Sequence, residues 1–423
     1  MHSHSHDLGA TAPAPRSTRL VLGLAMGVLG LLTLIGLALL WPTADETVAK
    51  RPYLAEGVTL TPGVVVALEP DAGSGGQIRL RLDDGGQEVV LQANPEVFFS
   101  DIQLGDHVRA VRLPPVAGSD QATYAFMDFY RGWPLLGLAA LMVVVVVAVA
   151  RLKGLAAIAG LAGGMALVWF FLLPALTAGK NPLLVVLTTA AAALFIIVYL
   201  AHGVSVKTTT ALLGTFAGTA VVATLAWWAI PAVRLTPMAH DDLMALAYAV
   251  PGLDLKGILL SGMVLAGIGV LNDVTITQAA AVWELRAAAP TATRRAVFAR
   301  AMRIGRDHIA STVYTIAFAY VGSALGLLAL ASTLDHTVMD LLTFEEIASE
   351  LVAILVASVG LVSAIPLTTA IGAWLAGGPI APAPATTMAS ATTTASAPAP
   401  ATTTTTASAP AITSAPATAP PSD

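Results

Sequence analysis

The sequence predicts an α-helical polytopic membrane protein of about eight transmembrane helices, with a small β-rich, barrel-like extracytoplasmic domain. Of its 423 residues, 56% are hydrophobic and only 11% are charged, and the mean hydropathy is +0.78. Soluble domains carry about 25% charged residues, so this chain lacks the residues that a water-exposed surface needs. Long apolar segments recur along the chain, whereas residues 42–133 contain the apolar–polar alternation of half-buried strands.

Eight apolar segments match the length of a transmembrane helix, although the second of them is short. A hydrocarbon core of about 30 Å needs roughly 20 apolar residues of helix. The segments lie at 20–41, 134–150, 155–176, 183–201, 209–231, 257–280, 309–331 and 351–375. A signal peptide is the alternative for the first segment. Its apolar run exceeds the usual length of roughly 7–15 residues and no small-x-small cleavage site follows, so we expect an uncleaved anchor.

The basic residues of the short loops predict the orientation, because they collect on the cytoplasmic side. With the N-terminus inside, the inner segments contain Arg16, Arg19, Arg151, Lys153, Lys207, Arg286, Arg294, Arg295, Arg300, Arg303 and Arg306. The short outer loops contain only Lys180, Arg234 and Lys256. We therefore expect both termini in the cytoplasm and residues 42–133 outside.

Residues 42–133 are predicted to form the β-rich domain. QIRLRL, the turn DDGG and QEVVLQ form the pattern of a hairpin, and VVVALE and DHVRAVRL add two further strands. Tyr124, Phe126, Phe129, Tyr130 and Trp133 cluster just before the second apolar segment. Aromatic residues gather at membrane interfaces, so we interpret this cluster as an aromatic belt.

The two ends of the chain differ in composition from the rest. Residues 1–19 are predicted to be a flexible cytoplasmic segment, in which His2, His4 and His6 alternate with other residues. Imidazole binds transition ions, but a flexible segment with incidental affinity is the favoured interpretation. Residues 376–423 consist almost entirely of Ala, Thr, Pro and Ser, and we expect them to be disordered.

One polar stretch interrupts the sixth apolar segment. On a helix, Asp273, Thr277 and Glu284 lie within about 40° of one another, so they share one face. A carboxylate inside the bilayer costs roughly 2.5–3.5 kcal/mol, so we expect Asp273 to turn inward, towards a partner or a cavity, or to be protonated. Asn272 and Gln278 flank this face.

A second polar cluster begins the seventh segment. Arg306, Asp307 and His308 are followed by Ser311 and Thr312. Consecutive membrane helices with a short connection are neighbours, so the two clusters are expected to meet near the cytoplasmic side. Asp273–Arg306 and Glu284–His308 are the candidate pairs.

The last segment adds a third polar region. Pro366 interrupts the helix beside Thr368 and Thr369, an arrangement that transporters use to expose backbone carbonyls. Glu345, Glu346 and Glu350 precede this segment. They are interpreted as a solvated face, with a cation funnel as the alternative.

These residues define a hypothetical site for a substrate or an ion. It comprises Asn272, Asp273, Thr275, Thr277, Gln278, Glu284, Arg306, Asp307, His308 and Thr312. The alternative is that the hydroxyls and amides only hold helices together, and for the threonines we favour it. The chain has no cysteine, and we expect no dedicated metal site and no cofactor.

The polar blocks resemble the YibE/F-like family of bacterial membrane proteins over about residues 135–375. LNDVTITQAAAVWELRAA, RIGRDHIASTVYTIAFAY and GLVSAIPLTTAI carry the resemblance. It implies a bacterial plasma-membrane location and a family described as permeases or efflux proteins, without an established activity. The motif positions that it implies are Asn272, Asp273, Thr275, Gln278, Glu284, Arg286, Arg306, Asp307 and His308.

The leading hypothesis for the function is a permease or exporter of a small solute or ion. Asp273 would bind a cation or carry a coupled proton, and His308 would relay the proton. The alternative is a non-transporting scaffold or assembly factor whose outer domain binds an envelope protein. An intramembrane enzyme has the least support, because no GxGD, HExxH or Ser/Lys constellation occurs in the spans. We expect the lipid bilayer as a partner and no nucleic acid.

Overall fold

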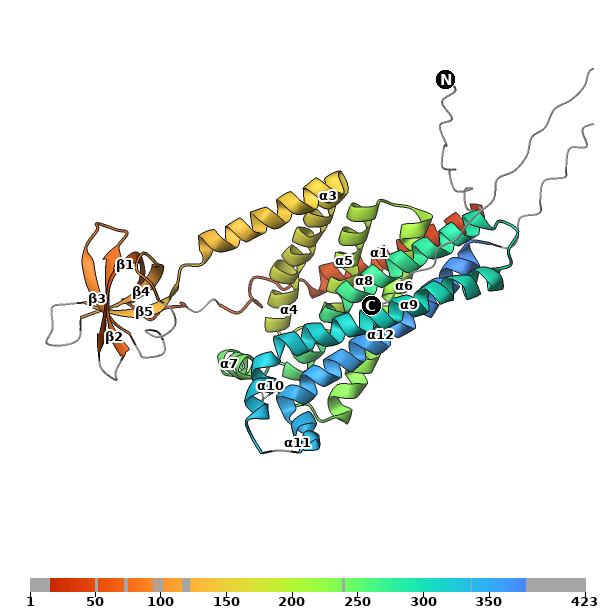
Figure 1. Ribbon diagram of the computed structural model, residues 1–423. Coiled ribbons are helices and arrows are strands. Elements are labelled where there is room, and N and C mark those ends of the chain that lie inside the picture. The colour runs from red at the N-terminus through yellow and green to blue at the C-terminus, as the bar shows by residue number, and fades with distance from the viewer. Residues whose placement is uncertain are drawn as a thin grey trace, which may run out of the picture. The chain divides into compact units, whose positions relative to one another are not determined.

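The computed structural model describes residues 16–49, 52–71, 75–93, 97, 102–115, 122–237, 240–335 and 337–377 (Figure 1). The predictions for His2, His4 and His6 and for the tail at 376–423 fall outside the described residues, apart from the first two residues of the tail.

Five strands form a small closed barrel. They are β1 (Thr59–Asp71), β2 (Gly75–Leu82), β3 (Glu88–Ala93), β4 (His107–Leu113) and β5 (Thr123–Phe129). Their order around the barrel is β1-β2-β3-β5-β4, and only β3 and β5 are parallel. This is a five-stranded Greek-key barrel of the OB type. Gly63 permits β1 to pair with both β2 and β4, because a Cβ at Gly63 would lie 2.6 Å from the carbonyl oxygen of Arg81.

The alternating pattern of the strands determines the barrel core. Ile78, Leu80 and Leu82 point inward and are buried. Arg79 and Arg81 point outward, where they pair with Glu69 and Glu88 at 2.7 Å and 3.4 Å. The four predicted strands are thus found in the structure.

The prediction of an aromatic belt is wrong for three of its five residues. Tyr124, Phe126 and Phe129 belong to β5 and pack against the barrel core. The rings of Phe126 and Phe129 lie 5.4 Å apart, edge to face. These residues precede an apolar segment, which suggested a membrane interface. Aromatic residues are equally typical of β-strands, and these three lie in β5. Tyr130 and Trp133 are exposed.

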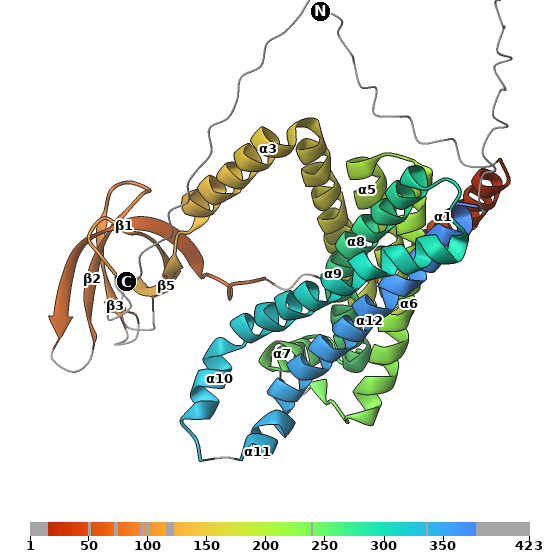
Figure 2. The same cartoon turned by 45° about the vertical axis from the view of Figure 1, so that its right-hand side comes forward.

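The remaining chain is helical. The first helices are α1 (Arg16–Leu40), α3 (Gly132–Leu167), the π-helix η1 (Val168–Leu172), α4 (Leu173–Thr177), α5 (Pro182–His202) and α6 (Val206–Ala232). They are followed by α7 (Asp241–Ala249), α8 (Leu255–Ala288), α9 (Arg294–Ser323), α10 (Leu325–Ser332), α11 (Val338–Thr343) and α12 (Glu345–Leu375). Figure 2 shows α9 and α12 side by side, with α10 and α11 connecting them at one end.

Among the described residues, six helices are long and apolar enough to cross a membrane, or up to seven if α9 and α10, which are bent by 66°, form one span. The sequence predicted eight. The predicted segments 134–150 and 155–176 fall within one helical run of 46 residues, Gly132–Thr177. That run is broken at Arg151, whose φ of 53° and ψ of −134° are not helical. Counting α9 and α10 as one span gives seven, and the remaining difference lies in whether this broken run is counted as one span or two.

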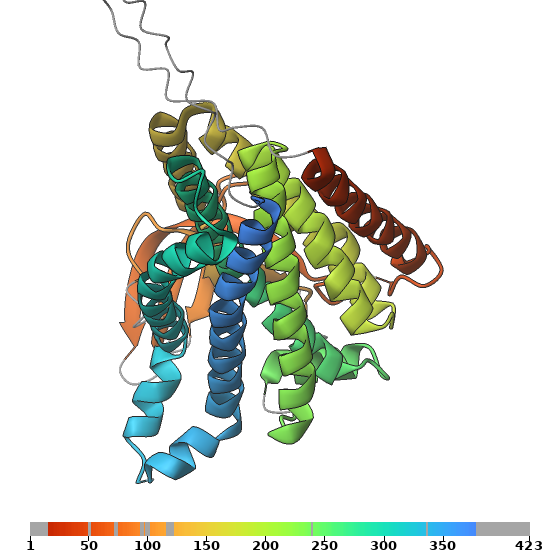
Figure 3. The same cartoon turned by 90° about the vertical axis from the view of Figure 1, so that its right-hand side faces the viewer.

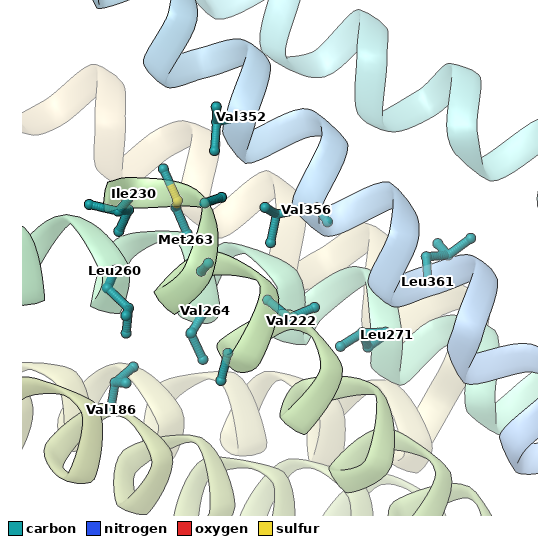
Figure 4. Close-up of a cluster of buried hydrophobic side chains, with 14 of the residues drawn as sticks. Val186, Val222, Ile230, Leu260, Met263, Val264, Leu271, Val352, Val356 and Leu361 are labelled. Carbon is teal, nitrogen blue, oxygen red and sulfur yellow. The ribbon is translucent and has the colours of Figure 1, made fainter. Parts of the chain in front are cut away.

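The helices α6, α8 and α12 pack closely around an apolar core (Figure 4). Val222, Leu271 and Leu361 are almost completely buried there. Glycines permit the close approach: a Cβ at Gly218 would lie 2.9 Å from the side chains of Ala364 and Leu271. In Figure 3, α1 lies at the edge of the bundle, and Gly36 on α1 contacts Thr188 of α5.

Candidate functional site

The helix α8 carries most of the predicted site. It begins where the Asp254 side chain accepts a hydrogen bond from the Gly257 backbone N–H at 3.0 Å. Two faces of α8 differ in composition. The buried face combines apolar residues with Thr275, Gln278 and Arg286. The exposed face contains Asp273, Thr277 and Glu284.

The expectation that Asp273 turns inward is wrong, because its side chain is exposed. Packing decides which face of α8 is buried. Leu271, Val274 and Gln278 follow the helical spacing i, i+3, i+7 and pack towards α6 and α12. Asp273 therefore lies on the outer face, with Thr277 and Glu284 on the same face as predicted.

Gln278 connects three helices inside the bundle. Its Nε2 donates to the carbonyl oxygen of Ala301 at 3.0 Å and to Thr369 Oγ1 at 2.7 Å. Gly305 leaves space for this amide, since a Cβ there would lie 3.1 Å from Gln278 Oε1. The hydroxyls of Thr275 and Thr215 share a second buried hydrogen bond of 2.6 Å. The geometry at Gln278 and Thr275 is that of helix adhesion.

The second polar cluster lies on α9 and does not form the candidate pairs. Arg306 and Asp307 are exposed, and His308 is half-buried. Among the ion pairs of the described residues, Glu284 lies 3.7 Å from Lys207 Nζ, and neither Asp273–Arg306 nor Glu284–His308 occurs. Thr312 donates its hydroxyl hydrogen to the carbonyl oxygen of His308 at 2.9 Å.

Two buried polar atoms of the predicted site have no hydrogen-bond partner among the described residues. They are Oδ1 of Asn272 on α8 and Nε2 of His308 on α9. Such atoms are uncommon, because leaving a buried polar atom unpaired costs roughly 1–3 kcal/mol. Because both atoms are buried, only a group that enters the helix bundle could pair with them.

A stripe of small residues extends from Asp273 along the exposed face of α8. We call Gly262, Ala266, Gly269, Asp273 and Thr277 the α8 stripe; all five are exposed. A Cβ added at Gly262 or Gly269 would meet no atom within 4 Å. No other part of the described structure therefore covers the α8 stripe at these two glycines.

One end of the α8 stripe opens into a pocket of about 370 Å³. Its polar lining consists of His240, Tyr320, Ser349 and Glu350. Its apolar lining consists of Leu243, Ile258, Leu259, Gly262, Met263, Ala266 and Ala353. Apart from Glu350, whose acidic segment was noted in the sequence, these residues were not predicted. They come from four helices and the residue before α7, so no local sequence signal unites them.

The bundle has two ends of opposite charge. At one end the Thr18 hydroxyl donates to the carbonyl oxygen of Leu375, so the start of α1 lies beside the end of α12. Arg286 and Lys207 lie at this basic end. At the other end Lys180 donates to Glu46 at 2.5 Å, which holds the pKa of that carboxyl below its usual value. The described acidic residues of this second, acidic end include Asp45, Glu46, Asp241, Asp242, Asp254, Asp335, Asp340, Glu345, Glu346 and Glu350.

The composition, the long apolar helices and the buried interhelical hydrogen bonds define a helical membrane protein. The family described as YibE/F-like protein matches residues 138–378, which is more than half of the chain, and the protein belongs to this family. No curated protein and no solved structure shows significant similarity to the chain.

Proposed function

We propose that the protein is a multi-pass permease or exporter of a small solute or ion, and that the α8 stripe lines the path. The observation that carries this proposal is an exposed carboxylate in the middle of a long apolar helix, on a stripe that leads to a largely apolar pocket with one carboxylate, Glu350. Asp273 forms no ion pair with any described residue. A carboxylate in contact with lipid costs roughly 2.5–3.5 kcal/mol, so contact with water or a cation is the favourable alternative.

The neighbouring residues support the same path. Small side chains at positions 262, 266 and 269 leave room for a solute beside α8. Asn272 and His308 provide polar atoms that lack partners among the described residues. In this scheme Asp273 binds a cation or carries the coupled proton, and His308 relays the proton. Thr277 and the exposed Arg306 and Asp307 lie towards the basic end.

The proposed topology has eight spans and cytoplasmic termini in the bacterial plasma membrane, with the barrel outside. The 46 residues of Gly132–Thr177 would measure about 69 Å as one helix, more than twice the thickness of a hydrocarbon core. The break at Arg151 divides this run into two arms, each long enough to cross. The hydrogen bond between Thr18 and Leu375 supports the placement of the start of α1 and the end of α12 on the same side of the membrane. The basic residues at that end of the bundle favour the cytoplasmic side.

The proposal is tested with the full-length protein in proteoliposomes. Indicator dyes follow protons, sodium and potassium, and radiolabelled methylamine serves as a small amine. We expect flux above protein-free liposomes for at least one probe and a decrease of about tenfold or more in Asp273→Asn, which lacks the negative charge. Asp242→Asn at the acidic end is the matched control and should retain the flux. Equal flux in wild type and Asp273→Asn would refute the role of Asp273.

The second candidate is a membrane scaffold that binds an envelope protein through the barrel. The barrel has its own closed apolar core, centred on Ile78, Leu80 and Leu91, so it does not need the bundle to bury its side chains. Barrels of this type commonly bind ligands on their surface. Absence of flux for every probe, with a defined protein bound to the barrel, would favour the scaffold.

A further inference from the structure

We propose that the pocket at the acidic end binds a small organic cation, such as a substituted ammonium ion. This assignment rests on the proposed function and names its substrate class. The pocket has about 370 Å³ of space, and its lining combines the Glu350 carboxylate and the Tyr320 side chain with His240, Ser349 and apolar walls. Organic cations combine a positive charge with apolar surface, and this lining complements both.

Glu350 supplies the charge. It is half-buried, and it forms no hydrogen bond or ion pair with any other described residue. No lysine or arginine lines the pocket, and the one histidine in its lining, His240, lies beside Ser349 and forms no ion pair with Glu350. A half-buried carboxylate without a basic partner favours a cationic ligand, because the ligand replaces lost solvation.

The other walls distinguish an organic cation from a metal ion. Tyr320 lines the pocket, and ammonium groups bind favourably to the faces of tyrosine rings. Leu243, Leu259 and Met263 provide apolar contact. Calcium and magnesium require six or more oxygen ligands, which this lining does not provide. The described residues also contain no group of three or more His, Cys, Asp or Glu suited to a metal ion.

Polar contacts fasten the segment before α7 beside the pocket. The backbone N–H and the hydroxyl of Thr236 both donate to Glu345 at the start of α12. His240 Nε2 lies 3.4 Å from the hydroxyl of Ser349 on the same helix. Glu345 is therefore occupied by the protein itself, whereas Glu350, five residues further along α12, remains free for a ligand.

The surrounding charge favours cations as well. Asp241 and Asp242 lie in the first turn of α7, so the acidic end attracts positive ions. Gly262 and Ala266 belong both to the pocket lining and to the α8 stripe. A cation bound at Glu350 would thus lie at the start of the path that leads to Asp273.

The test is equilibrium dialysis of radiolabelled benzyltrimethylammonium against the full-length protein in lipid nanodiscs. We expect saturable binding that weakens by about tenfold or more in Glu350→Gln. Tyr320→Leu should weaken binding severalfold, whereas Tyr320→Phe, which keeps the ring, should bind as wild type does. Glu346→Gln is the charge-matched control, because Glu346 lines a different hollow between α10, α11 and α12.

Three results would overturn the assignment: no saturable binding by the wild type, equal competition by the anion benzoate, or unchanged binding in Glu350→Gln. The outcome is separable from that of the flux measurement. Saturable binding that depends on Glu350, without flux of any probe, would keep the cation site and remove the transport role. Flux of an inorganic ion, without binding of benzyltrimethylammonium, would refute the assignment of organic cations as the substrate class and leave the transport proposal standing.

Discussion

Gly218→Leu is expected to prevent the bundle from forming a stable fold. A Cβ at this position already lies 2.9 Å from Ala364 on α12 and 2.9 Å from Leu271 on α8. The helices α6 and α12 also pack closely at Gly360, where a Cβ would lie 3.8 Å from the carbonyl oxygen of Gly218 and 2.2 Å from the Val222 side chain. Three further carbons would force α6 away from both neighbours, at more than about 3 kcal/mol.

The measurement is the yield of monodisperse protein in detergent and its thermal unfolding midpoint. Gly269→Leu is the matched control, because a Cβ there meets no atom within 4 Å. It should fold as the wild type does, and its larger side chain should block the proposed path and abolish flux. A Gly218→Leu protein with the yield and unfolding midpoint of the wild type would show that α6, α8 and α12 do not pack as described.

Arg286→Ala is expected to open the basic end of the bundle. Arg286 is only 6% exposed, and its guanidinium donates to the carbonyl oxygens of Ala292 at 2.7 Å and Gly377 at 2.6 Å. These bonds join the end of α8 to the loop before α9 and to the end of α12. Hydrogen bonds to charged groups contribute roughly 1.5–3 kcal/mol each, so the loss should be about 3 kcal/mol or more.

Hydrogen exchange provides the measurement for Arg286→Ala. Amide protection should fall in residues 289–296 and in the last turn of α12, while the barrel remains protected. Arg303→Ala is the control, because Arg303 is exposed and has no ion pair among the described residues. If protection at both segments stays as in the wild type, Arg286 does not hold this end together.

The sequence was sufficient to predict the features that depend on the two-residue period of a strand or the 3.6-residue period of a helix. The alternation of QIRLRL predicted the half-buried strand β2, in which Ile78 and Leu80 are buried, and the helical period placed Asp273, Thr277 and Glu284 on one face. Periodicity does not reveal which face points inward when both contain polar residues. On α8, the larger apolar residues occupy the face of Gln278, and that face is buried.

Other features depend on contacts between distant segments and could not be predicted. The pocket combines Tyr320 with His240, Glu350 and Gly262, which lie in different helices or just before one. The hydrogen bonds of Gln278 were also unpredictable, because their partners lie 23 and 91 residues away. The break at Arg151 was not predicted as such, since positive φ is rare outside glycine.

Reaction of single cysteines with a charged, membrane-impermeant thiosulfonate tests most directly whether the α8 stripe contacts water. The chain has no native cysteine, so each introduced thiol reports alone. We predict that Ala266→Cys and Gly269→Cys react in nanodiscs, whereas Leu138→Cys, an exposed position in the apolar helix α3, does not. If the two stripe positions are as unreactive as Leu138→Cys, the stripe faces lipid and the proposed path does not exist.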